Sequence, residues 1–227
     1  EMQMEDKFKE ALFNDSALLG ASKFISKSSF VVMKFDADSI SKKSNWETIV
    51  KLVKNRQHNQ LIPIIVLTSL SGVQRLLNKI IKNPASTSSK NILKTIKEQH
   101  YSLAASLNIN GEAILNELYD ELEQLVSSIY LIKEVNTKVH IRIIALGKLM
   151  VTEIGTAYLQ SQGISARQAD SRKLLTSKNS EDTKKTSNYL SASCDFSPDT
   201  ELQSKFIKEN KVILIQGQIA KNLSNET

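Results

Sequence analysis

The 227-residue chain contains one cysteine, three prolines, seven glycines and only 6% aromatic residues. A single cysteine, Cys194, excludes a disulfide within the chain and is typical of a reducing compartment, and we expect its thiol to be buried among apolar side chains. No apolar run approaches the ~20 residues that a membrane-spanning helix needs. The opening residues EMQMEDKFKEAL are acidic and amphipathic, unlike a secretory signal peptide. These features predict a cytoplasmic protein without a membrane partner, and a first residue other than methionine suggests a fragment or a processed chain.

Positive charge is in excess, with 30 basic and 24 acidic residues and a net charge of +6. The lysines are scattered, and their densest cluster, SRKLLTSKNSEDTKKTS, is interrupted by Glu181 and Asp182. The few aromatic residues do not alternate with basic ones, as they do in a surface that stacks nucleic-acid bases. We therefore expect no nucleic-acid partner. The excess charge would instead form a solvated surface and assist the approach of an anionic substrate.

No metal site is expected from the histidines, because His58, His100 and His140 are far apart and lack the spacing of metal ligands. We interpret them as surface or packing residues.

The pattern of apolar residues predicts alternating strands and helices. Strands are expected at 30–35, 61–69, 164–170 and 211–220. Helices are expected up to about Ser26, at 45–56 with Asn45 as its cap, at 72–82, through most of 91–162 with a break at 108–111, and at 197–210. Residues 171–189 are polar and predict an exposed loop. This order predicts an α/β fold, a mainly parallel sheet sandwiched by helices with a long helical insertion.

Ligands of such sheets bind beyond the carboxyl ends of the strands, here residues 34–39, 68–72, 170–172 and 217–218. The first of these ends lies in the stretch FVVMKFDADSI, where a lysine follows an apolar strand as it does beside many phosphate sites. Asp36 and Asp38 stand where a phosphate-binding loop needs glycine. They are interpreted as turn or capping residues, with a divalent-ion site as the alternative.

Four segments, taken in order, resemble the aspartokinases of the amino-acid kinase family. The family's K-F-G-G-(T/S)-S corresponds to KFDADS at 34–39, and its V-S-A-M-(S/A)-G-V-T-(N/D)-x-L to VLTSLSGVQRLL. The family helix that contains G-E-x-(L/M)-S-(T/A) is similar to one carrying GKLMVT, followed by AYLQSQG and ADSR. The last strand, VILIQGQIAKN, resembles a family strand that ends in G-F-I-A-x-N. The resemblance runs from 29 to 227 and leaves 1–28 as an N-terminal helical extension.

The resemblance implies an amino-acid-kinase-like fold and an ATP- and Mg²⁺-dependent phosphorylation of the aspartate β-carboxylate, a step towards lysine, threonine and methionine. It implies that Lys34 stabilises the transferred phosphoryl group as a catalytic residue, with Asp36 and Ala37 in the phosphate loop. The substrate-binding positions that it implies are Ser39, Thr68, Ser71, Gly72, Lys148 and Gly217. The family's G-R-G-G-S-D segment and nucleotide-binding half would lie past residue 227, so this chain is expected to lack them. A homodimer or a longer polypeptide is the expected context.

The departures from the family pattern fall on the residues that would perform the chemistry. Asp36 and Ala37 replace two glycines, and each carboxylate ~5 Å from a phosphate would cost roughly 3 kcal/mol at an effective dielectric of ~20. Lys148 replaces a glutamate that, in the family, meets the ammonium of aspartate. Gln74 and Gln218 replace a threonine and a phenylalanine. We therefore expect a catalytically impaired aspartokinase-like domain; the alternative is a non-catalytic pseudokinase-like remnant that binds a ligand or partner.

Overall fold

The computed structural model describes residues 28–177, 194 and 197–221. In these residues four strands form one parallel sheet in the order β1-β2-β4-β3. The strands are β1 (Phe30–Lys34), β2 (Ile62–Leu67), β3 (Ala166–Gln168) and β4 (Val212–Gln216). Lys34 pairs with Val66 in the register, so the strands end level with one another at the carboxyl edge. The predicted α/β fold with a parallel sheet is confirmed.

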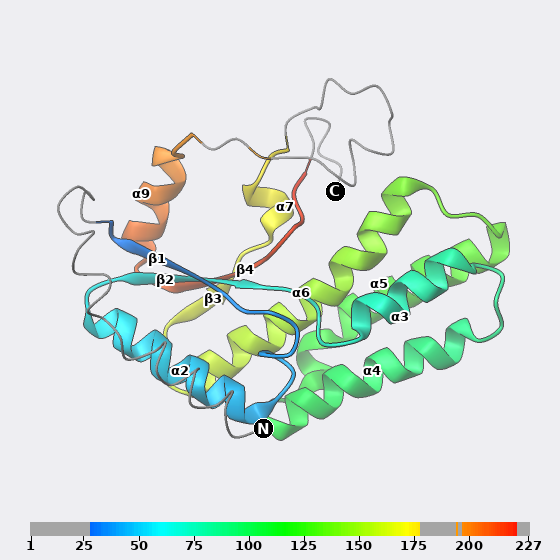
Figure 1. Ribbon diagram of the computed structural model, residues 1–227, viewed down its shortest axis with the longest axis horizontal. Coiled ribbons are helices and arrows are strands. Elements are labelled where there is room, and N and C mark those ends of the chain that lie inside the picture. Colours follow the sequence, from blue (N-terminus) through cyan, green and yellow to red (C-terminus); the bar gives the residue numbers. More distant parts are fainter. Residues whose placement is uncertain (1–27, 178–193, 195–196, 222–227) are drawn as a thin grey trace, which may run out of the picture.

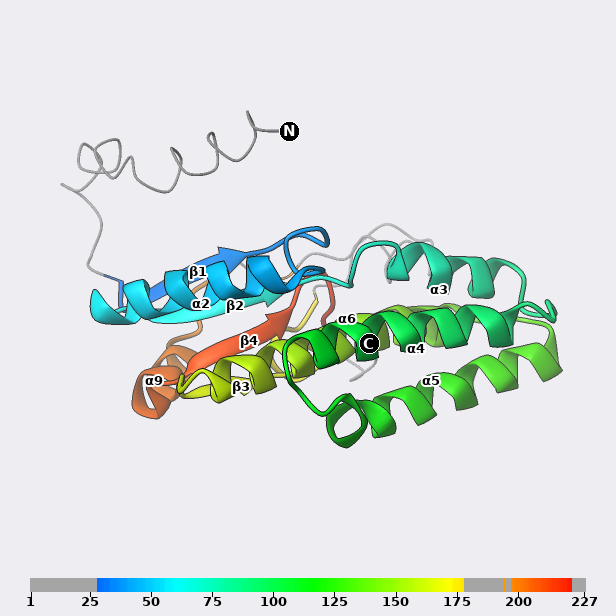
Figure 2. The same ribbon diagram turned by 90° about the horizontal axis from the view of Figure 1, so that it is seen from below.

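Helices cover the sheet and extend beyond its carboxyl edge. They are α2 (Lys43–His58), α3 (Val73–Lys82), α4 (Ser89–Ser106), α5 (Gly111–Ile132), α6 (Thr137–Ser161), α7 (Ser171–Leu174) and α9 (Thr200–Glu209). Figure 1 shows α2 on one face of the sheet and α9 on the other. Helices α3, α4 and α5 lie past the strand ends and pack along α6, as both Figure 1 and Figure 2 show. The predicted helical insertion is therefore a layer built onto the carboxyl edge of the sheet.

Helix α6 crosses beneath the sheet and joins it to the helical layer. Gly155 permits this crossing, because a Cβ placed there would lie 2.4 Å from Trp46 Cη2 and 3.1 Å from Leu214 Cδ2. The Trp46 ring is fully buried and donates a 2.8 Å hydrogen bond from Nε1 to the Ile40 carbonyl. It also meets Tyr158 of α6 edge-on, with ring centroids 6.2 Å apart. The glycine and the tryptophan together fix the distance between α6 and α2.

Two local predictions are wrong. Asn45 does not cap α2, which begins at Lys43 after an N-cap without a side-chain hydrogen bond; its amide instead donates to the Asp38 carbonyl and ties the helix to the preceding loop. The start of the predicted loop 171–189 is the short helix α7, because the Asp170 side chain accepts a hydrogen bond from Arg172 N and caps it. Residues 178–189 of that loop, and the predicted helix before Ser26, lie outside the described residues.

Cys194 is also placed differently from the prediction. It is half-exposed, in an isolated antiparallel bridge with Ser177 outside both apolar clusters. Bridging at the rim of the fold leaves its thiol partly accessible rather than buried.

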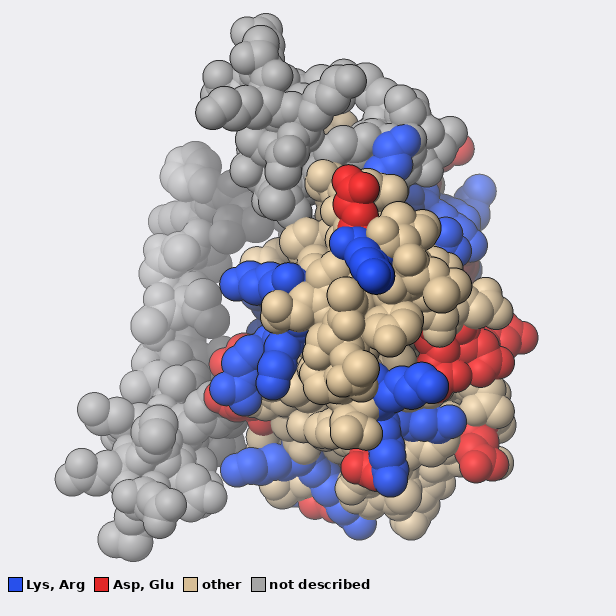
Figure 3. Space-filling model, turned by 90° about the vertical axis from the view of Figure 1, so that its right-hand side faces the viewer, with Lys and Arg blue, Asp and Glu red and all other residues tan. Residues whose placement is uncertain are grey.

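Among the described helices, none combines the length and the apolar composition that would let it cross a lipid bilayer. Figure 3 looks at the outer end of the helical layer. Lysine and arginine side chains are separated there by uncharged surface, and acidic side chains gather along one side. On this face the positive charge therefore forms no continuous stripe.

Replacing Gly155 by alanine should destabilise the fold by about 1–3 kcal/mol, since the added methyl has no room against the buried Trp46 ring. Urea unfolding measures the change. Gly111→Ala is the comparison, because its Cβ would lie 3.3 Å from Ala104 Cβ rather than 2.4 Å from a buried ring, and it should destabilise the fold less than Gly155→Ala does. Equal effects of the two substitutions would show that α6 does not depend on this contact.

Candidate functional site at the carboxyl edge of the sheet

The loop after β1 is held by its own side chains. Phe35 N continues the pairing with β2 by donating to Val66 O at 3.0 Å. The Asp36 carboxylate accepts a 2.8 Å hydrogen bond from Ser39 N, and its hydrogen bonds with Ser39 lower its pKa. Asp36 is thus a turn residue, as interpreted from the sequence. A consequence is that the Ser39 N–H already has an acceptor within the loop.

A second contact joins this loop to the one after β2. The Ser41 hydroxyl donates to the Ala37 carbonyl at 2.6 Å and accepts from Ser71 N at 2.9 Å. Gly72 follows at φ +80°, a conformation that glycine adopts without strain, and is the N-cap of α3. The sequence-predicted positions 39, 71 and 72 therefore lie in two loops that a single hydroxyl holds together.

Lys148 lies at the centre of this edge and is only 2% exposed. Its Nζ donates a 2.8 Å hydrogen bond to the carbonyl of Gly217, just after β4. Gly217 N in turn donates to Leu67 O at 2.7 Å, so β4 is locked to β2 at the same point. Burial lowers the pKa of Lys148 to about 8. The ammonium therefore links α6 to the end of β4.

Two buried polar atoms beside this link have no hydrogen-bond partner: Ser69 Oγ and Gln216 Nε2. Ser69 Oγ would lie 3.5 Å from a Cβ at Gly147, the residue that precedes Lys148 on α6. Gln216 is held at its other end, where Oε1 accepts from Ser171 N at 2.9 Å. Both Ser69 Oγ and Gln216 Nε2 can donate a hydrogen bond, so a ligand that supplies acceptor atoms would complement them.

The sequence analysis included Ser69 and Ser171 in the strand-end ranges 68–72 and 170–172 without giving either a role, and it missed Gln216. A signal existed for Gln216, because it follows the apolar run VILI in a strand that is mostly buried. Nothing in the sequence indicates that Ser171 would accept from Gln216 N and donate to its carbonyl, since 45 residues separate the two.

The predicted catalytic lysine lies elsewhere. Met33 and Phe35 pack against the cluster around α6, whereas Phe30 packs against the cluster beneath α9. Successive side chains in a strand point to opposite faces, so Lys34 lies on the α9 face and is exposed. Thr68 follows β2 in the same alternation and is half-buried. The structure thus brings Lys148 and Gly217 together on one side, where Ser69 lies against Gly147, and leaves Lys34 and Thr68 on the other.

Asp170 and Arg172 form a half-buried ion pair at the rim of the edge, with Nη2 and Oδ2 2.7 Å apart. Burial alone would raise the pKa of Asp170, but the Arg172 hydrogen bonds and charge outweigh it and lower that pKa. Each charge has its partner within the pair, so the Asp170–Arg172 ion pair stabilises the start of α7.

His100 is buried in α4, with Nδ1 2.8 Å from the Ile96 carbonyl, and burial lowers its pKa. It is a packing residue, as the sequence suggested. In the segments that the structure covers, no three histidine, cysteine or acidic side chains gather closely enough to hold a metal ion.

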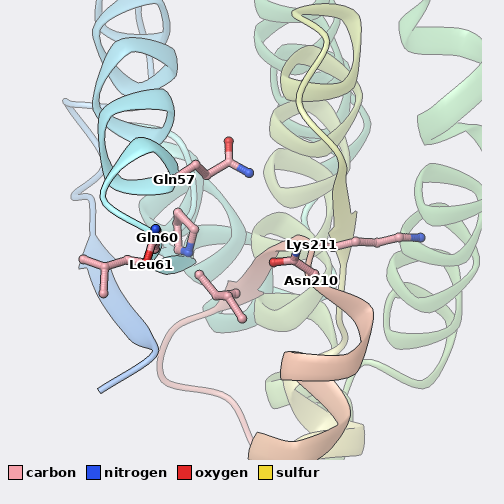
Figure 4. Close-up of a pocket in the computed structure, with 7 residues that line it drawn as sticks. Gln57, Gln60, Leu61, Asn210 and Lys211 are labelled. Atoms are coloured by element: carbon pink, nitrogen blue, oxygen red, sulfur yellow. The ribbon is translucent and has the colours of Figure 1, made fainter. Parts of the chain in front are cut away.

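A hollow of about 350 Å³ lies at the opposite edge of the sheet. Figure 4 shows Gln57, Gln60 and Leu61 on one side of the hollow and Asn210 and Lys211 on the other, near the amino ends of β2 and β4, with the Lys211 side chain extending away from it. In parallel α/β sheets the ligand site lies at the carboxyl ends. We therefore keep the carboxyl edge as the candidate site.

The buried ammonium should make stability depend on pH. The pKa of Lys148 is about 8 in the fold against 10.5 when unfolded, so between these pH values the unfolded chain binds more protons and stability rises with pH. From pH 7 to pH 10, the free energy of unfolding should rise by about 1–2 kcal/mol more in the wild type than in Lys148→Met. Denaturant unfolding at both pH values measures it. Parallel curves would show that the ammonium is not buried.

The sequence model of the amino acid kinase family matches residues 29–226. Aspartokinase 1, chloroplastic, of Arabidopsis thaliana is 31% identical over 144 residues, which are 61% of this chain and 25% of that protein. Aspartokinase 2, chloroplastic, of the same plant is 27% identical over 61% of this chain and 26% of its own length. The chain therefore spans about a quarter of the curated relatives that it matches.

Solved structures agree in fold. E. coli aspartokinase III in complex with aspartate and ADP matches with a TM-score of 0.71 and 17% identity, over 87% of this chain and 42% of that one. The same enzyme in complex with lysine and aspartate matches with a TM-score of 0.72 and 17% identity, over 88% and 43% of the two chains. Together with a family match that extends over nearly all of the sequence, the parallel sheet and the helical layer show that this chain belongs to the amino acid kinase family.

Proposed function

We propose that residues 29–227 are an aspartokinase-like domain that, as this chain, does not phosphorylate aspartate. The observation that carries the proposal is the hydrogen bond from Lys148 Nζ to the Gly217 carbonyl. The aspartokinase pattern has a glutamate at position 148, where it would attract an amino group. Here the chain provides its own ammonium at that place, and the ammonium of an amino-acid substrate would meet a like charge.

The phosphate side supports the same proposal. A solved relative binds aspartate and ADP, so a nucleotide with its magnesium is the group to test against these residues. They do not fit it: the Ser39 N–H is occupied by the Asp36 carboxylate, and Asp36 and Asp38 put negative charge where a polyanion would lie. Lys34 is exposed and available to meet a phosphate. The domain is therefore better suited to binding an acceptor-rich ligand or a partner than to transferring phosphate.

A second candidate function is a working aspartokinase that also uses other parts of a longer polypeptide. The observation that favours it is the length of the family match, 29–226, in a chain that spans only 25% of its relative. Under that reading the reaction would feed lysine, threonine and methionine biosynthesis, with Ser39, Thr68, Ser71, Gly72 and Gly217 as substrate contacts.

Calorimetric titration of the chain with MgATP should give no measurable binding, and phosphoryl transfer to aspartate should be absent. Asp36→Gly/Ala37→Gly removes one carboxylate and frees Ser39 N, so it should gain binding in the millimolar range, up to about 100-fold tighter than the wild type. The control is Ala37→Gly alone, which keeps the carboxylate and should not bind. A micromolar dissociation constant in the wild type would refute the proposal and support the second candidate.

A further inference from the structure

One face of the sheet is less covered than the other in the described residues. On the α6 face Ile65, Leu67 and Leu214 are 0–1% exposed. On the α9 face Val32 is 64% exposed, and Val66 is only half-buried. Parallel sheets are normally covered on both faces, and the strands of this one are apolar on both. The carboxyl half of β1 and β2 therefore presents apolar surface that needs a cover.

Helix α9 covers only the other part of this face. Its Phe206 packs with Ala169 and Ile213, and the half-buried Phe30 and Ile64 lie against that cluster. Val32 and Val66 belong to neither apolar cluster. The open patch, defined by Val32 and Val66, is therefore small and lies between α9 and Lys34.

We propose that the N-terminal segment, residues 1–27, packs as an amphipathic helix on this open patch. The segment leads directly into β1, and helices that precede a strand are usually joined to it by two to six residues. Its apolar residues recur at helical spacing and are Met4, Phe8 and Leu12, followed by Leu18, Leu19 and Phe24. Helix α2, which follows β1, already covers the opposite face. The N-terminal segment before β1 and helix α2 after it would then cover the two faces of this strand.

Length and charge fit this occupant. Twenty helical residues span ~30 Å, whereas a five-residue strand such as β1 spans ~17 Å, so the segment can cross the patch. Its first 13 residues carry four acidic and two basic side chains, and exposed Lys34 borders the patch. A second copy of the chain fits the patch less well. A stable dimer buries ~800 Å² on each partner, whereas the patch of two valines and their half-buried neighbours is only wide enough for one helix.

Thiol labelling tests this proposal in the full chain. In a Cys194→Ser background, Val32→Cys places a reporter thiol in the patch, and Ile207→Cys places a reference thiol on α9, where the native side chain is 48% exposed. Uncharged iodoacetamide avoids attraction to Lys34. Only molecules with an uncovered patch react at position 32. If the segment covers the patch in at least ten molecules out of eleven, the thiol at position 32 therefore reacts about tenfold more slowly than the one at 207.

Two pairs of substitutions identify the cover. Phe8→Asp/Leu12→Asp charges the apolar side of the segment and should bring the rate at position 32 to that at 207. Gln3→Asp/Ala17→Asp adds the same two charges on the side of the helix away from Phe8 and Leu12 and should leave the slow rate unchanged. Equal rates at 32 and 207 in the unaltered segment would overturn the proposal. So would a slow rate that survives Phe8→Asp/Leu12→Asp, and a dependence of that rate on protein concentration would identify a second copy as the cover.

Discussion

The close approach of α6 to its neighbours is the constraint on which the rest of the fold depends. The helix packs on the sheet and against α3, α4 and α5, and two of its residues have no side chain where a side chain would not fit. Gly155 lies against Trp46 and Leu214, and at Gly147 a Cβ would lie 2.9 Å from Leu77 Cδ1. A larger residue at Gly155 would push α6 away from α2 and the sheet, and one at Gly147 would push it away from α3. The helical layer, which rests on α6, would then lose its place at the carboxyl edge.

The same helix brings Lys148 to the end of β4, one residue after Gly147. A buried ammonium is costly unless it is hydrogen-bonded, and the Gly217 carbonyl supplies that bond. The loop after β1 shows a similar use of polar groups, since Asp36 accepts from Ser39 N. In both places the polar groups are hydrogen-bonded within the chain. These two contacts are the basis of the proposal that the domain does not phosphorylate aspartate.

Much of this fold is predictable from the sequence, because its signals are local and periodic. β-branched runs such as IPIIVL mark the strands, and the order of strands and helices indicates a parallel sheet. The motifs at the strand ends identified the relatives. The prediction went wrong at Asn45, where a contact with the Asp38 carbonyl competed with the capping role that residue type alone suggests.

The arrangement of the site could be predicted only in part. Sequence order placed Lys34 and Gly217 at one edge of the sheet, and the family resemblance added Lys148, but neither could say on which face each side chain lies. Strand alternation separates Lys34 from Lys148, and this depends on a register that only the folded sheet defines. The pairing of Ser171 with Gln216 joins residues 45 positions apart, so no local pattern announces it.

The central claim is that the ammonium of Lys148 occupies the place where the ammonium of an amino-acid substrate would bind. The most direct test is a titration of the wild-type chain with aspartate, followed by the amide NMR signals of Gly72, Gly147 and Gly217. The account predicts no shifts at millimolar aspartate in the wild type, and shifts at these glycines once Lys148→Glu restores an acidic partner. Saturable shifts of the same three signals in the wild type would show that the pocket still accepts aspartate, and would contradict the account.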